Sequence, residues 1–238
     1  MTVATTLGVV LFLAGMVAVL LVAVRRRNVP AIVNALASLG VTLLPLAVDS
    51  LGRTAFAWDV TVGPILPLWV GAAGFLHSLG MLGPYDTIQW WDSVTHTLSA
   101  ALVAALVYAG LIVVAGSSDG VPSSVAVATV AFTFLGGVFW ELIELLAREI
   151  GDRYDVEPVL VHYSWRDTVT DLVFDVVGAL AVVLGDVRAF VRLGEQAPQA
   201  TETLVVASGA VVAGGSALLA VAVLVNRGTG ARPAEDGR

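Results

Sequence analysis

The sequence predicts an all-α protein, a polytopic membrane bundle of about seven transmembrane helices, and two observations support this fold class. The 238-residue chain is 58% hydrophobic and only 13% charged, with a mean hydropathy of +0.90 that lies far above the range of soluble domains. Polar breaks also divide it into apolar stretches of about 20 residues, the length that a helix needs to cross a hydrocarbon core of ~30 Å.

The predicted spans follow in chain order from these stretches. Turns are predicted at Asn28–Pro30, at Gly83–Pro84 and in the GSSDG stretch 116–120, because Gly, Pro and Asn interrupt helices. We expect a single domain over 1–226 and a short disordered cytoplasmic tail over 227–238. The helices are expected near residues 3–24, 30–52, 61–82, 88–115, 122–147, 166–186 and 203–225.

The arginines predict the orientation of the bundle. A cleavable signal peptide carries its charges before the apolar run, whereas here Arg25, Arg26 and Arg27 follow it, so the first helix is expected to stay in the membrane. Cytoplasmic loops are enriched in Arg and Lys. A cytoplasmic triplet predicts an outer N-terminus and an inner C-terminus, which leaves few arginines outside: Arg53, Arg188 and Arg192.

Composition and missing motifs exclude several classes of protein. The chain has no Cys, so disulfides, thiolate metal sites and thiol catalysis are excluded. A net charge of −7 argues against nucleic-acid binding. A seven-helix retinal protein needs a Schiff-base lysine, and the chain contains no Lys. The P-loop and H-E-x-x-H motifs are also missing.

An acidic stripe interrupts the sixth predicted helix. In DTVTDLVFD, Asp167, Asp171 and Asp175 are four residues apart, so they share one helical face over ~12 Å. Asp167 fits equally a capping box that begins at Ser164. Asp171 and Asp175 lie beyond the reach of such a cap, and an Asp at the centre of a membrane helix costs ~2.5–3.5 kcal/mol. These two acids therefore need another explanation.

Three other predicted helices bring polar residues to the same cytoplasmic end. Asp92 and His96 lie one turn apart in WDSVTH at the start of the fourth helix. The fifth helix carries Glu141 and Glu144 of WELIE near its end, and the third carries His77. No single pair is specific, but the convergence of four helices predicts a functional site.

Several of these residues also have structural explanations. Asp86 followed by Gln89 fits a cap for the fourth helix, which would place Asp92 inside that helix. Glu144 and Arg148 have the spacing of a surface ion pair worth about 0.3–0.5 kcal/mol. A lone His in a membrane helix is more often an interhelical hydrogen-bonding group than a ligand.

The acids must be neutralised, either by protons, as in a proton relay, or by a divalent cation. Carboxylates with an imidazole suit Mg²⁺, Mn²⁺, Ca²⁺ or Zn²⁺. We expect catalytic roles for His96, Glu141 and Asp171, an additional ligand at His77, and a less strongly supported gate or ligand at His162. The metal ligands are expected among Asp92, His96, Glu141, Glu144, Asp167, Asp171 and Asp175.

The order of the polar residues over roughly residues 70–185 resembles the YjdF-type family of uncharacterised multi-pass membrane proteins. The resemblance rests on His77 with Gly80, Asp92-x-x-x-His96, Glu141-x-x-Glu144, Asp167-Thr168 with Asp171-Leu172, and Gly178-Ala179. It implies that the polar signature of the family consists of Asp92, His96, Glu141, Glu144, Asp167 and Asp171.

The chain departs from that family pattern in two places. The family has a run resembling W-D-T-Q-W-D where this chain reads RDTVTD at 166–171, and Ser99-Ala100 stand where a Gly is usual. The acids are retained and the aromatic surround is not. The family supplies no established activity, so function has to be argued from the site.

Two classes of function compete for a protein of the cell membrane, whose partner is the lipid bilayer. The first is a divalent-metal-dependent enzyme (Mg, Mn or Zn) acting on a lipid or lipid-linked substrate at the cytoplasmic leaflet. The alternative is a proton- or cation-coupled transporter that uses the same acids, and a third option is a structural protein with a stabilising ion. Apart from Asn34 and Asp49 in the second helix, polar residues gather at one end, which favours the enzyme.

Overall fold

The computed structural model describes residues 3–55, 60–116, 121–155, 160 and 164–230. Regular structure within these residues is entirely helical, which confirms the all-α prediction. The helices are α1 (Val3–Arg26), α2 (Val29–Ala55), α3 (Ile65–Gly80), α4 (Pro84–Thr87), α5 (Trp91–Ala115), α6 (Ser123–Tyr154), α7 (Trp165–Leu184), α8 (Val191–Glu195) and α9 (Pro198–Gly230).

Five of the described helices are long and apolar enough to cross a membrane: α1, α2, α5, α6 and α9. The helix α3 is apolar but has only 16 residues. The 20-residue α7 carries Arg166, Asp167, Asp171 and Asp175 in its first half. Each predicted span therefore corresponds to a helix, and two of these helices lack the length or the composition of an ordinary membrane span.

The fourth predicted span, expected near residues 88–115, corresponds to a helix that begins at Trp91. Gly83 adopts a φ of 134°, which favours glycine, and lets the chain turn into the short helix α4. The helix α5 then begins at Trp91, and its N-cap Trp90 makes no side-chain capping bond. The helix α5 therefore does not begin at the cap expected from Asp86 and Gln89, and Asp92 lies in its first turn.

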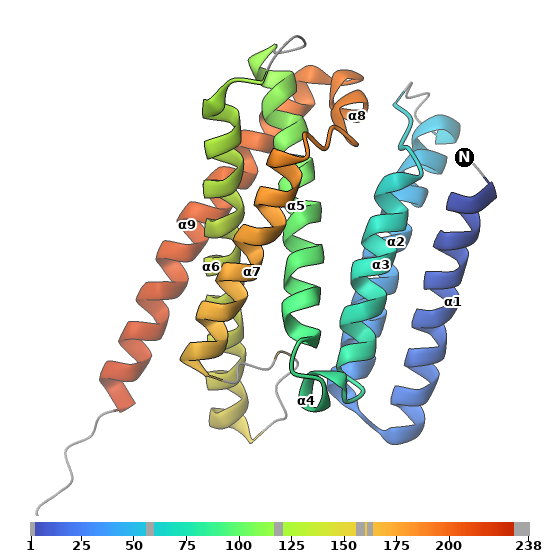
Figure 1. Ribbon diagram of the computed structural model, residues 1–238. Helices are drawn as coiled ribbons and strands as arrows, with labels where there is room; N and C mark the ends of the chain where they lie inside the picture. The colour runs from blue at the N-terminus through green and yellow to red at the C-terminus, as the bar shows by residue number, and fades with distance from the viewer. Residues whose placement is uncertain (1–2, 56–59, 117–120, 156–159, 161–163, 231–238) are drawn as a thin grey trace, which may run out of the picture.

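The helices form two groups, α1–α3 and α5–α7 with α9, which meet where α3 packs against α5 (Figure 1). At that junction Nε1 of Trp69 donates a hydrogen bond to the carbonyl oxygen of Leu98 at 3.1 Å. Figure 1 places α4 and the turn between α1 and α2 at one end of the bundle, and α8 at the other. We call these the α4 end and the α8 end.

The most extensive contact joins α5 and α7, which carry four of the six acids predicted as ligands: Asp92, Asp167, Asp171 and Asp175. Small residues line it, including Ala101, Ala104 and Ala105 of α5 and Ala179 of α7, all buried. A Cβ on Gly178 would lie only 2.5 Å from the carbonyl oxygen of Thr97. The two backbones therefore approach as closely as glycine and alanine allow, a packing typical of membrane helices.

Candidate metal centre

Acids of α5 and α7 meet at the α4 end of the bundle: Asp92 is half-buried, and Asp171 and Asp175 are buried. Asp92 and His96 come from the first two turns of α5, and Asp171 and Asp175 from the middle of α7. One ligand atom each of Asp92, His96 and Asp171 lies within 4.8 Å of the other two, and we call these residues the Asp–His–Asp group. Asp171 is 3% exposed and Asp175 5%, so these two acids are withdrawn from water. A charge in such an interior needs a counter-ion or a metal.

The imidazole of His96 lies between two carboxylates. Its Nδ1 is 3.1 Å from Oδ1 of Asp175, and its Nε2 is 3.7 Å from Oδ1 of Asp92. In the tautomer that donates from Nδ1 to Asp175, Nε2 keeps its lone pair and faces Asp92. Metal-binding histidines commonly have this arrangement, in which a carboxylate on the far nitrogen fixes the tautomer and the ring orientation. Asp175, expected to be a ligand, thus lies where it can orient His96.

Asp171 supplies the most informative detail of the site. Its Oδ1 is buried and has no hydrogen-bond partner among the described residues. Leaving a buried polar atom unsatisfied costs about 1–3 kcal/mol, and more for a charged group. A cation held by the Asp–His–Asp group would satisfy this oxygen, so the donor set of two carboxylates and one imidazole fits a divalent metal ion.

The helix α6 closes the site with a glycine and two glutamates. A Cβ on Gly137 would collide with Oδ2 of Asp175, so the α6 backbone lies directly against this carboxylate. Glu141, one turn further along, is 3% exposed. Glu144 accepts a hydrogen bond from Nε1 of Trp140 at 2.8 Å. Both glutamates lie beside the Asp–His–Asp group and outside it.

The surface ion pair suggested for Glu144 and Arg148 is replaced by a contact between Arg148 and Asp152. Nε of Arg148 lies 3.9 Å from Oδ2 of Asp152, one turn further along α6 and exposed to solvent. Glu144 instead pairs with an indole that itself packs edge-on against the ring of His77, with 6.2 Å between the ring centroids. Glu144 therefore belongs to the interior of the α4 end.

His77 is linked to the site through the hydroxyl groups of Tyr85 and Thr95, which were not among the predicted site residues. The Tyr85 hydroxyl lies 2.6 Å from Nδ1 of His77 and donates to Oγ1 of Thr95 at 3.3 Å. Oγ1 of Thr95 lies 3.4 Å from Oδ1 of Asp92. His77 thus contacts the site indirectly and does not join the Asp–His–Asp group. The sequence signal for the Tyr85–His77 contact is the turn at Gly83, because Tyr85 follows it by only two residues and so stays close to the end of α3.

The stripe of α7 divides into a cap and a buried pair. The backbone N–H of Asp167 donates to Oγ of Ser164 at 3.2 Å, which confirms the predicted N-cap. Asp167 is half-buried at the entrance to the site, whereas Asp171 and Asp175 are buried. His162 lies outside the described residues.

The fold and the site define a helical membrane protein with an acid-lined centre near one end. The chain belongs to the family described as "Predicted membrane protein (DUF2238)", whose model matches residues 7–192. This match confirms the resemblance to an uncharacterised membrane-protein family. It spans α1 to α7 and the start of α8, and so includes all the site residues above. No curated protein and no solved structure matches the chain.

Proposed function

We propose that the protein is a divalent-metal-dependent enzyme that acts on a lipid or lipid-linked substrate at the cytoplasmic leaflet of the cell membrane. The observation that carries this proposal concerns Asp171, which is grouped with Asp92 and His96. Its buried Oδ1 has no hydrogen-bond partner in the part of the chain that the structure describes. A carboxylate in this position is costly to the fold unless it binds something.

The proposed topology has seven membrane-spanning helices, with the N-terminus outside and the C-terminus inside. The helices α3 and α7 would be about 24 and 30 Å long, so both reach across most of a hydrocarbon core of ~30 Å. Asn28, which follows the arginine triplet, donates to the carbonyl oxygen of Met81 at 3.2 Å, so the triplet lies at the α4 end. Arg148, Arg153 and Arg166 also belong to this end, which the positive-inside rule assigns to the cytoplasm.

Each residue has a role in this proposal. Asp92, His96 and Asp171 would hold the metal ion, either Mg²⁺, Mn²⁺ or Zn²⁺, and the metal would supply Lewis-acid chemistry toward water or a phosphate. Asp175 would orient His96. Glu141, buried on α6 beside the group, is the proposed proton acceptor, because it is a carboxylate close to the centre and outside the ligand set.

The alternative is a proton- or cation-coupled transporter, which the hydrogen-bonded series His77, Tyr85, Thr95 and Asp92 would suit. A transporter also needs a polar route to the other side of the membrane. Between the site and the α8 end, the buried residues at the α5–α7 contact are mostly small and apolar, such as Ala104 and Val182. This apolar seam favours a reaction confined to one leaflet.

Elemental analysis of the purified protein in detergent tests the proposal. We expect one divalent ion per chain, lost in Asp171→Asn and retained in Asp152→Asn, a matched control on an exposed carboxylate. A metal-free protein whose unfolding temperature does not respond to Mg²⁺, Mn²⁺ or Zn²⁺ would overturn the metal-dependent enzyme and leave proton coupling as the better explanation.

A further inference from the structure

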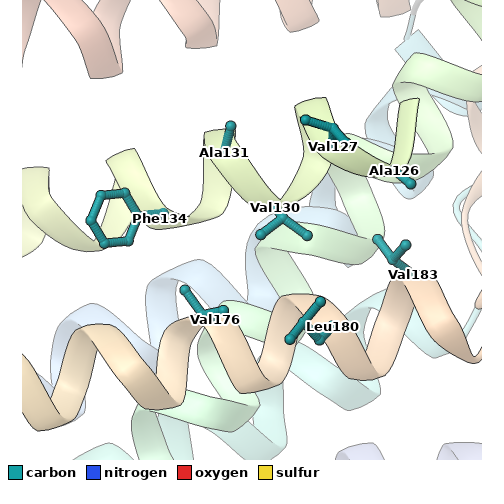
Figure 2. A pocket seen from close by; sticks show the side chains of 8 residues that line it. All are labelled: Ala126, Val127, Val130, Ala131, Phe134, Val176, Leu180 and Val183. Carbon is teal, nitrogen blue, oxygen red and sulfur yellow. The ribbon is translucent and has the colours of Figure 1, made fainter. Parts of the chain in front are cut away.

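An apolar groove of about 480 Å³ runs along the outer face of the α6–α7 pair (Figure 2). Val127, Val130 and Phe134 line it from α6, and Val176, Leu180 and Val183 line it from α7. Val127 is 68% exposed and Phe134 41%, so the groove is open to the surroundings of the bundle. In a membrane protein these surroundings are hydrocarbon chains, so an apolar chain is expected to fill the groove.

The groove ends close to the proposed metal centre, measured along the helix axes. Val176 directly follows Asp175 in the sequence, and Phe134 lies one turn before Gly137, whose missing Cβ leaves room for the carboxylate of Asp175. The end of the groove nearest the α4 end is therefore about one helical turn from the acids. From Asp171 to Val183 the rise along α7 is about 18 Å, close to the ~15 Å depth of one leaflet's hydrocarbon.

We propose that this groove binds one hydrocarbon chain of a lipid whose headgroup, a phosphate monoester, lies at the Asp–His–Asp group. The inference rests on the proposed function, because carboxylates alone repel a phosphate and a divalent cation between them reverses that sign. The apolar groove fixes the chain, and the metal fixes the headgroup. Together they select a lipid with a phosphate-monoester headgroup over phosphatidylcholine and over a water-soluble phosphate.

The absence of cysteine allows a direct test, because a single introduced thiol can carry a fluorophore. Val127→Cys places the label in the groove, and Val206→Cys on α9 is a matched control, since the two valines are 68% and 67% exposed. The labelled proteins are placed in phosphatidylcholine vesicles with Mg²⁺. Quenching by phosphatidic acid with brominated chains is then compared with quenching by phosphatidylcholine with the same chains.

We expect brominated phosphatidic acid to quench the label at Val127→Cys severalfold more than brominated phosphatidylcholine, with no such preference at Val206→Cys. The preference should disappear when Ala131→Trp fills the groove, while metal content is unchanged. It should also disappear in Asp171→Asn, because the headgroup loses its cation.

Two results would overturn the inference. Equal quenching by the two lipids at Val127→Cys, in a protein that retains its metal, would rule out the groove and leave the proposed function standing. A preference that survives Asp171→Asn would show a lipid site unconnected to the acids. Absence of metal in the parent protein would instead overturn the proposed function itself.

Discussion

The two ends of the bundle treat their acidic side chains differently. At the α8 end, Oδ1 of Asp186 accepts hydrogen bonds from the Tyr108 hydroxyl at 2.8 Å and from Nε of Arg188 at 2.9 Å. Arg188 also donates to the second oxygen at 3.0 Å. At the α4 end, three carboxylates, Asp92, Asp171 and Asp175, gather around one imidazole.

The difference separates the structural role of Asp186 from the ligand-binding role that we propose for the acids of the α4 end. An acid that only joins elements together is best served by a permanent cation such as Arg, with its fixed fork of donors. Asp186 at the α8 end follows this rule. The same end is also held by Gln196, which exchanges two hydrogen bonds with the backbone of Thr61, at 2.6 and 3.1 Å. Carboxylates that are buried without such a cation destabilise the fold unless a bound ligand neutralises them.

The stability of the fold should be most sensitive to mutation at the α5–α7 contact. Gly178→Ala places a Cβ 2.5 Å from the carbonyl oxygen of Thr97 and 2.9 Å from the backbone nitrogen of Ala101, and neither backbone atom can move aside easily. We expect a loss of about 1–3 kcal/mol, measured by thermal unfolding in detergent. The matched control is Gly209→Ala on α9, where nothing lies within 4 Å and the better helix former should be neutral or stabilising. Equal stability of the two variants would refute close α5–α7 packing.

Asp175 should matter to the metal more than to the fold. Asp175→Ala removes the carboxylate that orients His96, and we expect metal affinity to fall about 10–100-fold. Asp175→Asn keeps a hydrogen-bond acceptor for Nδ1 and should recover part of that loss. Titration calorimetry with Mg²⁺, Mn²⁺ or Zn²⁺ measures both variants. Unchanged affinity in the alanine variant would remove Asp175 from the site.

Tyr85→Phe should have a smaller effect. It removes the hydroxyl between His77 and Thr95 and leaves the ring that packs against His77. We expect thermal unfolding to show a loss of about 0.5–1.5 kcal/mol, with metal content unchanged. If metal were lost, the hydroxyl series would have to be counted as part of the centre.

The smallest effect is expected at the exposed Asp186. The hydrogen bonds from Arg188 and Tyr108 lower the pKa of the Asp186 carboxyl. The unfolded chain therefore takes up this proton at a higher pH than the folded chain, so the stabilisation is present at neutral pH and is lost as the pH falls through the folded-state pKa. Asp186→Asn should lower the unfolding temperature slightly at neutral pH and not at acid pH. A difference that grows in acid would contradict this sign.

Part of this architecture could be predicted from sequence periodicity. Helical spacing placed Asp171 and Asp175 on one face of α7, and Asp92 and His96 on one face of α5, and the structure brings those faces together. Periodicity says nothing of how far each helix rotates about its axis. That rotation decides that Asp171 joins the ligand atoms while Asp175 contacts the far side of the imidazole.

Contacts that depend on an irregular turn could not be predicted in this way. The position of Tyr85 depends on Gly83, whose left-handed φ directs the chain back toward α3. Capping rules alone suggested that Asp86 begins a long helix, and the backbone instead makes α4 and starts again at Trp91. Local preferences compete at such a turn, and the packing of Tyr85 and Trp91 against Gly80 decides between them.

The alanine and glycine seam between α5 and α7 has a consequence for the metal centre that we propose. With small residues at the contact between the two helices, the spacing of their acids is set by the main chain. A frame of this kind would not expand readily around a larger ion. Selectivity between Mg²⁺ and Ca²⁺ follows from cavity size and flexibility, so a rigid seam would discriminate by ionic radius, with no need for a different set of ligands.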